Sequence, residues 1–210
     1  TNKASSANYT NEAGEKIEHT QLIIDGYHKL GLEGLIIIGG DGSMQILQNI
    51  AKKGNLNIVA IPKTIDNDVG ATDSSIGFDT AVHVATQALD NLHSTAVSHS
   101  RSMILEVMGR DAGHIALSSG IAGGADIILM PEIKYSLKGI FNKLNEMKKK
   151  DLKHSLIVVA EAVKKENGEK VIHEFKDGQK RLGGIGEYIS NEIMSKTDIE
   201  CRVTALVHVQ

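Results

Sequence analysis

The chain has 210 residues, of which 41% are hydrophobic and 23% charged, and its formal net charge is −3. This composition is typical of a soluble globular protein with one large or two small domains, and it argues against nucleic acid as a partner. It contains no apolar run long enough to cross a membrane, and its single cysteine excludes an internal disulfide framework and favours a reducing, cytoplasmic compartment.

Short apolar runs alternate along the chain with stretches of helical period. Residues 1–15 are polar and predict a loop, and residues 15–30 predict a helix that ends at Gly31. The runs that predict strands are 35–38, 58–61, 103–107, 127–129, 156–160 and 202–209. The further stretches that predict helices are 43–53, 76–92, 114–121, 137–150 and 186–195. Residues 163–181 are polar and charged, which favours a loop or an irregular insertion.

This alternation predicts an α/β fold, doubly wound, with mostly parallel sheets. The runs 35–38 and 58–61 are continuously apolar, so both are expected to be buried strands. In such folds ligands bind beyond the carboxyl ends of the strands, so the residues that follow each strand are the candidates for a site.

The segment Gly39-Gly40-Asp41-Gly42-Ser43 follows the first buried run and precedes a helix. Glycines let the backbone approach a phosphate closely, and a helix N-terminus supplies N–H donors. Asp41 would repel a bare phosphate, and a divalent cation between the two removes that conflict. A tight turn with Asp41 or Ser43 as the helix N-cap explains the same residues equally well.

Two acids, Asp66 and Asp68, follow the second buried run, with Lys63 close by. Paired carboxylates suit general-base chemistry and metal binding, and a lysine can hold a phosphate as a point charge. The plain alternative is a solvated turn. It is less favoured, because closely spaced like charges repel one another without an evident structural gain.

Arginines lie at both ends of the predicted strand 103–107. Arg110 follows the strand among glycines at the start of a helix, where a guanidinium suits a phosphate or a phosphoryl group in transfer. Arg101 precedes the strand and is therefore expected at the opposite end of the sheet. It could reach the same site only from a neighbouring subunit, and an ordinary surface arginine is the alternative.

Three further candidates are weak when taken alone. Glu161 follows strand 156–160, and it could accept sugar hydroxyls or simply be solvated. Arg202 and His208 flank the last predicted strand. Met108 and Cys201 are explained more simply by packing than by chemistry.

Seven segments together resemble the 6-phosphofructokinase family, in the ATP-dependent type with a lysine-containing PKTIDND motif. They are GGDGS (39–43), PKTIDND (62–68), SSIGFDTA (74–81), SHSRS (98–102), EVMGRDAGHIAL (106–117), IAGGAD (121–126) and RVTALVHVQ (202–210). The resemblance implies two Rossmann-like domains in the middle portion of a longer chain. Residues 1–77 would be part of the nucleotide-binding domain, and residues 78–210 most of the sugar-phosphate-binding domain.

The resemblance also implies a glycolytic kinase that transfers a phosphoryl group from MgATP to the 1-hydroxyl of fructose 6-phosphate. Asp66 then matches the general base, and Asp41 and Asp68 match the acids around Mg²⁺. Thr64 and Arg110 match groups beside the transferring phosphoryl group. The residues that match the nucleotide site are Gly40, Asp41, Gly42, Ser43 and Lys63. Those that match the sugar-phosphate site are Thr64, Asp66, Arg101, Met108, Gly109, Arg110, Glu161, Arg202 and His208.

Family members are tetramers built from dimers, in which residues matching Arg101 and Arg202 come from a neighbouring subunit. Gly42 favours ATP as the donor, since an acid there resembles the pyrophosphate-using branch, although Lys63 is shared with that branch. A pyrophosphate-dependent enzyme and a non-catalytic subunit are therefore the alternatives. Val207 departs from the family, which commonly has glycine at that position.

Overall fold

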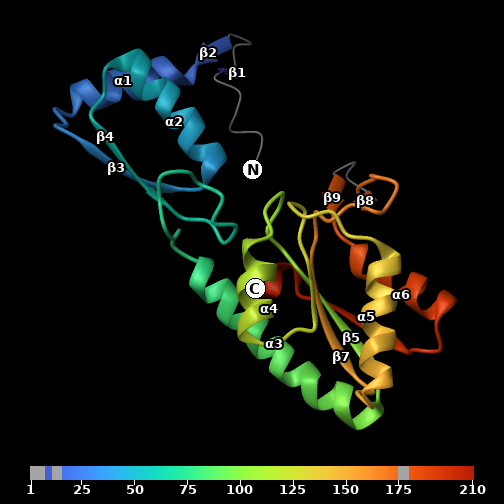
Figure 1. The fold of residues 1–210 in the computed structure, drawn as a ribbon. Coiled ribbons are helices and arrows are strands. Elements are labelled where there is room, and N and C mark those ends of the chain that lie inside the picture. The colour runs from blue at the N-terminus through green and yellow to red at the C-terminus, as the bar shows by residue number, and fades with distance from the viewer. Residues whose placement is uncertain (1–7, 11–15, 175–179) are drawn as a thin grey trace. The chain divides into compact units, whose positions relative to one another are not determined.

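The structure, a computed structural model, describes residues 8–10, 16–174 and 180–210. The chain forms two compact units, and Figure 1 colours it from the N-terminus to the C-terminus. The first unit comprises Thr1–Thr64 and Val69–Ser75, and the second comprises Ile65–Asp68 and Ile76–Gln210. Each unit has its own parallel sheet and its own hydrophobic core.

A two-stranded parallel sheet and two helices form most of the first unit. Strand β3 (Leu35–Gly39) pairs with β4 (Ile58–Pro62), so that the two strands end side by side at Gly39 and Pro62. Helices α1 (His19–Lys29) and α2 (Asp41–Gly54) contribute to a small core made of Ile24, Tyr27, Ile50 and Leu56. Strands β1 (Asn8–Thr10) and β2 (Lys16–Glu18) form a separate antiparallel pair.

The prediction for the start of the chain is wrong. Residues 1–15 were expected to form a loop with a helix directly after them, but β1 pairs with β2 and α1 begins only at His19. The sequence of β2 has one apolar residue between two charged ones, a period of two that favours a strand over a helix. The predicted helix end is confirmed, because Gly31 has a φ of +63° and Leu32 N–H donates to the Tyr27 carbonyl at 3.2 Å.

The expected burial of the first two apolar runs is also wrong. The side chains of Ile36, Ile38 and Val59 are 70%, 60% and 61% exposed. Alternate residues of a strand point to opposite faces of the sheet, and within this unit α1 and α2 pack on the face that carries Leu35 and Ile58. An apolar run predicts burial on both faces only where helices cover both faces.

Four parallel strands form the sheet of the second unit, in the order β10-β5-β7-β6. Their bounds are Ser102–Val107 for β5, Ile127–Leu129 for β6, Ser155–Ala160 for β7 and Cys201–Ala205 for β10. Every residue of β5 and β7 is buried. The α/β prediction with mostly parallel sheets is therefore confirmed.

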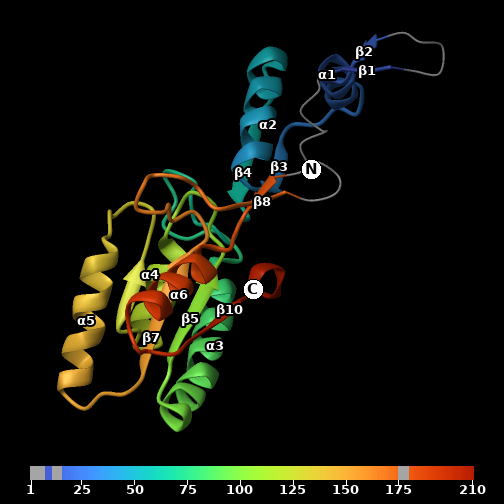
Figure 2. The ribbon, with the colours of Figure 1, turned by 90° about the vertical axis from the view of Figure 1, so that its right-hand side faces the viewer.

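Four helices cover the two faces of this sheet, as Figures 1 and 2 show. Their bounds are Phe78–His99 for α3, His114–Ala122 for α4, Leu137–Lys149 for α5 and Ile185–Lys196 for α6. Helices α3 and α4 pack on one face, and α5 and α6 lie on the other. The chain therefore leaves β5 towards one face through α4 and leaves its neighbour β7 towards the opposite face through α6. Such a divergence between adjacent parallel strands opens a crevice at their carboxyl ends, where ligands bind in open α/β sheets.

Two predictions for the C-terminal third are wrong in part. The strand expected over 202–209 ends at Ala205 and is followed by a 3₁₀ turn, Val207–Val209, because Val207 adopts a left-handed φ of +45° that no strand accommodates. The irregular insertion expected over 163–181 contains an antiparallel pair, β8 (Ile172–Glu174) with β9 (Lys180–Leu182). Residues 175–179 lie outside the described part of the chain.

Cys201 is a packing residue, as predicted. Its side chain is buried, and this burial raises the pKa of the thiol to about 11, so it is protonated at neutral pH. In the described residues, no helix has the length and apolar character needed to cross a membrane.

We expect neighbouring residues of α6 to differ sharply in their contribution to stability. Ile193 is fully buried in the core of the second unit, whereas Met194 beside it is 40% exposed. Ile193→Ala should lower the free energy of unfolding by about 2–5 kcal/mol, and Met194→Ala should change it by roughly 0.5 kcal/mol or less. Urea unfolding of the full-length protein, followed by far-ultraviolet circular dichroism, measures both. Equal effects would contradict the assigned helix orientation.

Candidate active site

The turn between β3 and α2 presents an open helix N-terminus. Gly40 is the N-cap, with φ −86° and no side chain to accept a hydrogen bond, and the helix begins at Asp41. The alternative in which Asp41 or Ser43 is the N-cap is therefore wrong. Asp41 instead accepts a hydrogen bond from Gln45 Nε2 at 2.9 Å, one turn further along. The first N–H groups of a helix have no intrahelical acceptor, which suits them to an anion.

Local packing explains one glycine of this turn but not another. A Cβ on Gly39 would lie 3.1 Å from Ser43 Cβ, so local packing favours glycine there. A Cβ on Gly42 would meet nothing within 4 Å, although glycine is costly inside a helix. Packing within the described residues thus gives no reason for glycine at position 42. A ligand that passes close to the backbone would supply that reason.

The end of β4 lies beside this turn. Lys63 N–H donates to the Gly39 carbonyl at 2.7 Å. A Cβ on Gly40 would lie 3.5 Å from the Lys63 carbonyl and 3.8 Å from Thr64 Cβ. The first unit therefore gathers six of the predicted site residues at one sheet edge: Gly40, Asp41, Gly42, Ser43, Lys63 and Thr64.

The second unit gathers two carboxylates at the carboxyl end of its sheet. Glu161 directly follows β7, and Asp66 belongs to the short segment Ile65–Asp68 that is part of this unit. Asp66 is only 6% exposed. The pKa of Glu161 is raised, mainly by burial and further by the negative charges of Asp66 and Glu106. Backbone N–H groups of Arg110 and Gly109 oppose that rise.

A strained turn after β5 contacts the same carboxylate. Gly109 has a φ of +141°, and a Cβ there would lie 2.4 Å from the Ala112 carbonyl oxygen, so this position requires glycine. Arg110 has a φ of +51°, which is uncommon for a residue with a side chain, and its N–H donates to Glu161 Oε1 at 3.0 Å. The sequence had suggested that Arg110 lies at the start of a helix. In the structure the turn precedes α4, whose N-cap is Gly113.

Asp111, next to Arg110, is engaged elsewhere. Its carboxylate forms an ion pair with Lys170 at 2.7 Å. The hydrogen bond and charge of Lys170, and to a lesser degree the charge of Arg110, lower the pKa of Asp111. The exposed side chain of Arg110 therefore lies next to an acid that already has a cationic partner.

A hollow of about 400 Å³ lies at this end of the sheet, a volume that suits a small-molecule ligand. It brings together the predicted residues Met108, Glu161 and His208. The remaining residues that line it are Glu106, Val107, Leu182, Gly183, Gly184, Glu187, Val203, Ala205 and Val207. Glu106, Glu187 and the pair Gly183-Gly184 were not among the residues predicted from the sequence. An acid inside an apolar strand and a Gly-Gly step before a helix were the signals that could have found them.

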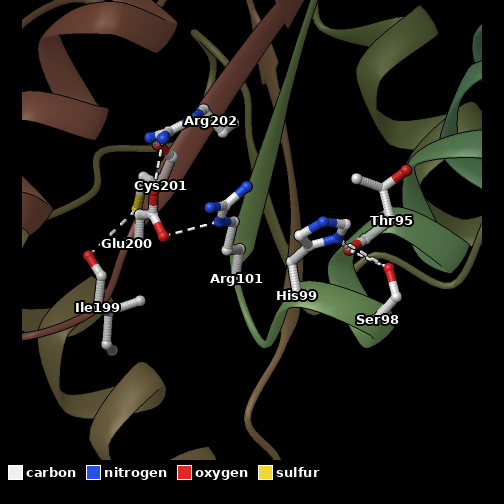
Figure 3. Close-up of polar contacts among 8 residues, drawn as sticks. All are labelled: Thr95, Ser98, His99, Arg101, Ile199, Glu200, Cys201 and Arg202. Carbon is white, nitrogen blue, oxygen red and sulfur yellow. Dashed lines mark hydrogen bonds and ion pairs between the residues drawn. The ribbon is translucent and has the colours of Figure 1, made fainter.

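Arg101 and Arg202 lie at the amino end of the sheet, opposite the hollow. Figure 3 shows both arginines beside Glu200. Arg101 Nε donates to Glu200 Oε2 at 2.7 Å, and Arg202 forms an ion pair with the other oxygen of the same carboxylate. The hydrogen bond and charge of Arg101, and to a lesser degree the charge of Arg202, lower the pKa of Glu200. The position of Arg101 confirms the sequence prediction. Within one chain, neither arginine is brought to His208.

The predicted metal ligands belong to different units, with Asp41 in the first and Asp68 in the second. Residues 8–10, 16–174 and 180–210 contain no group of three or more His, Cys, Asp or Glu side chains that could hold a metal ion. Mg²⁺ in nucleotide sites is bound by one or two carboxylates, with phosphates and water completing its shell. Each of the two carboxylates could supply one such oxygen ligand.

The phosphofructokinase family model matches residues 3–210. The chain is 53% identical over its whole length to the ATP-dependent 6-phosphofructokinase 1 of Synechocystis, and it spans 58% of that protein. The phosphofructokinase structure from Saccharomyces cerevisiae is similar with a TM-score of 0.75 and 26% identity, over 91% of this chain and 27% of that one. A pyrophosphate-dependent phosphofructokinase from Nitrosospira multiformis has a TM-score of 0.76 at 20% identity, over 96% of this chain and 50% of that one, and shows a shared fold alone.

Glu161 should make stability depend on pH in a defined direction. Its raised pKa means that the folded state holds the proton more tightly than the unfolded chain does. The free energy of unfolding should therefore fall as the pH rises from the ordinary pKa of glutamate to the raised one. Glu161→Gln cannot ionise, so the variant should lose less stability over that interval.

Urea unfolding of the full-length protein at several pH values measures this dependence. Glu146→Gln, on the exposed side of α5, is the control for the loss of one carboxylate. An identical pH dependence in the parent and in Glu161→Gln would show that burial of Glu161 has no such effect.

Proposed function

Since this chain belongs to the phosphofructokinase family, we propose that the full-length protein is an ATP-dependent 6-phosphofructokinase. It transfers a phosphoryl group from MgATP to the 1-hydroxyl of fructose 6-phosphate, a step of glycolysis expected in the cytoplasm. The observation that carries the proposal centres on Glu161, which lines the hollow, accepts a hydrogen bond from Arg110 N–H and lies close enough to Asp66 for the two charges to interact.

The second unit binds the sugar phosphate. Asp66 is the general base that takes the proton from the 1-hydroxyl, and its burial supports this role because a base shielded from water is better placed to act on a bound group. Glu161 accepts hydrogen bonds from sugar hydroxyls. Its carboxylate also fixes the turn that carries Arg110. Met108, Gly109 and His208 contact the substrate from the same end of the sheet.

The first unit binds the nucleotide. The N–H groups at the start of α2 and the ammonium of Lys63 hold phosphate oxygens, and Gly42 leaves the backbone open to close approach. Asp41 and Asp68 would hold Mg²⁺, which when bound offsets phosphate charge. Thr64 lies at the edge where this unit ends and contacts the transferring group.

Arg110 stabilises the charge that develops on the transferring phosphoryl group. Phosphoryl transfer needs mainly alignment and charge compensation, so a guanidinium on a rigid turn suits this role. The ion-pair partner of the neighbouring Asp111 is Lys170. The guanidinium of Arg110 is therefore not needed to compensate the charge of Asp111.

Arg101 and Arg202 serve the sugar-phosphate site of a neighbouring subunit in a dimer of dimers. What supports this is their place at the amino end of the sheet, away from the hollow that His208 lines. The non-catalytic alternative is disfavoured by the presence of Asp66, Asp68 and Arg110.

Asp66→Asn should lower kcat by at least about 10²-fold with little change in KM for fructose 6-phosphate, because the amide keeps the shape of the side chain but cannot accept a proton. A coupled assay of fructose 1,6-bisphosphate formation by the full-length protein measures both constants. Asp90→Asn, on the exposed surface of α3, is the matched control. Unchanged turnover in Asp66→Asn would remove Asp66 from the role of base.

Gly42→Asp tests the identity of the donor. A carboxylate at this position fills the open space beside the backbone and repels a nucleotide phosphate, so activity with ATP should fall by about 10²-fold or more while activity with pyrophosphate falls less. Parallel assays with the two donors measure this. Gly26→Asp in α1, where a Cβ also meets nothing within 4 Å, is the control. Greater activity of the parent with pyrophosphate than with ATP would favour the pyrophosphate-dependent alternative.

A further inference from the structure

Glu106 is a buried acid whose carboxylate contacts only backbone among its described hydrogen bonds. It lies in β5 and is 5% exposed. Its Oε1 accepts from Gly184 N–H and its Oε2 from Gly186 N–H, each at 2.8 Å. A buried carboxylate is costly unless it is hydrogen-bonded, so these two donors explain how the charge is tolerated. They do not explain why an acid occupies this strand.

The segment before α6 is shaped around that carboxylate. Gly184, the N-cap of α6, has a left-handed φ of +87°. A Cβ on Gly186 would lie 3.1 Å from Glu106 Oε2 and 2.9 Å from Val203 Cγ1, so the close approach requires glycine. Gly183 and Gly184 form part of one wall of the hollow. The position of this wall therefore follows from the Glu106 side chain.

The main chain of Glu106 holds a second wall. Its carbonyl accepts from Leu206 N–H at 3.1 Å, at the start of the turn that carries His208. The other end of that turn is also tied to β5, because Met108 N–H donates to Gln210 Oε1 at 2.7 Å. Both the glycine wall and the His208 turn are thus held by the end of one strand.

Capping of α6 does not by itself explain why a buried acid in β5 accepts from Gly184 and Gly186. Caps are usually short polar side chains at the N-cap position itself, whereas Glu106 reaches α6 from 78 residues earlier in the chain. Glu166 provides a comparison, since its Oε1 accepts from Leu137 N–H at 2.9 Å at the start of α5, which does not line the hollow.

We propose that Glu106 is a positioning residue of the sugar-phosphate site, which sets the distance between the glycine wall and the turn that carries His208. It acts through the backbone of residues 183–186 and does not touch the reacting atoms. The inference rests on the proposed function, because that function assigns the hollow to fructose 6-phosphate.

Glu106→Gln keeps one acceptor oxygen and turns an NH₂ group towards a backbone N–H, so two donors face each other and the wall must move. Gly186→Ala places a methyl group against the same carboxylate from the other side. Both variants should raise KM for fructose 6-phosphate by about tenfold or more, with kcat within about threefold of the parent and KM for ATP unchanged. Glu166→Gln should leave all three constants unchanged.

Steady-state kinetics of the full-length protein and its variants test whether Glu106 positions the glycine wall. Melting temperatures are measured alongside, and binding of fructose 6-phosphate is followed by calorimetry. A purely structural role would reduce the active fraction, and hence the apparent kcat, without raising KM. Unchanged KM in Gly186→Ala, or in Glu106→Gln where it folds, would overturn the inference while the proposed function stands. A parent protein that neither binds nor phosphorylates fructose 6-phosphate would overturn the proposed function and this inference with it.

Discussion

The divergence of the chain at β5 and β7 is the constraint on which the candidate site of the second unit depends. These adjacent parallel strands send their connections to opposite faces of the sheet, through α4 and α6. The ends of both strands therefore remain open to a ligand. Glu161 follows one strand and the Arg110 turn follows the other, and the hydrogen bond of 3.0 Å between them joins the two ends. The strained φ angles of Gly109 and Arg110 are maintained by this bond and by the buried strands behind it.

Much of the second unit could be predicted from the sequence, because its buried strands are continuous apolar runs and its helices have clear periods. The exit residues Asp66, Arg110 and Glu161 could also be predicted, since strand ends are where open α/β sheets bind ligands. The partners of Glu106 could not, because an acid inside a strand is visible in the sequence but does not indicate which distant backbone donors it meets. The turn at Val207 could not either, since valine favours a strand and only tertiary contacts hold it in a left-handed conformation.

In the first unit, the pattern of apolar residues is insufficient to predict which strand side chains are buried. Ile36, Ile38 and Val59 have the sequence signature of buried strands, yet within this unit helices pack on one face of the sheet only. The glycine turn is informative for the opposite reason. Its sequence allowed a simple capped turn, and the structure removes that explanation by placing Gly40 at the N-cap and open space beside Gly42.

Glu200 accepts from Arg101 and also pairs with Arg202, so one carboxylate neutralises only half of the charge of these two arginines. A surplus cation attracts an anion from outside the chain. In the proposed dimer of dimers, that anion would be the phosphate bound by an adjacent copy, and each copy would complete the site of another. Dissociation of the assembly on dilution would then weaken substrate affinity, and substrate would in turn promote association.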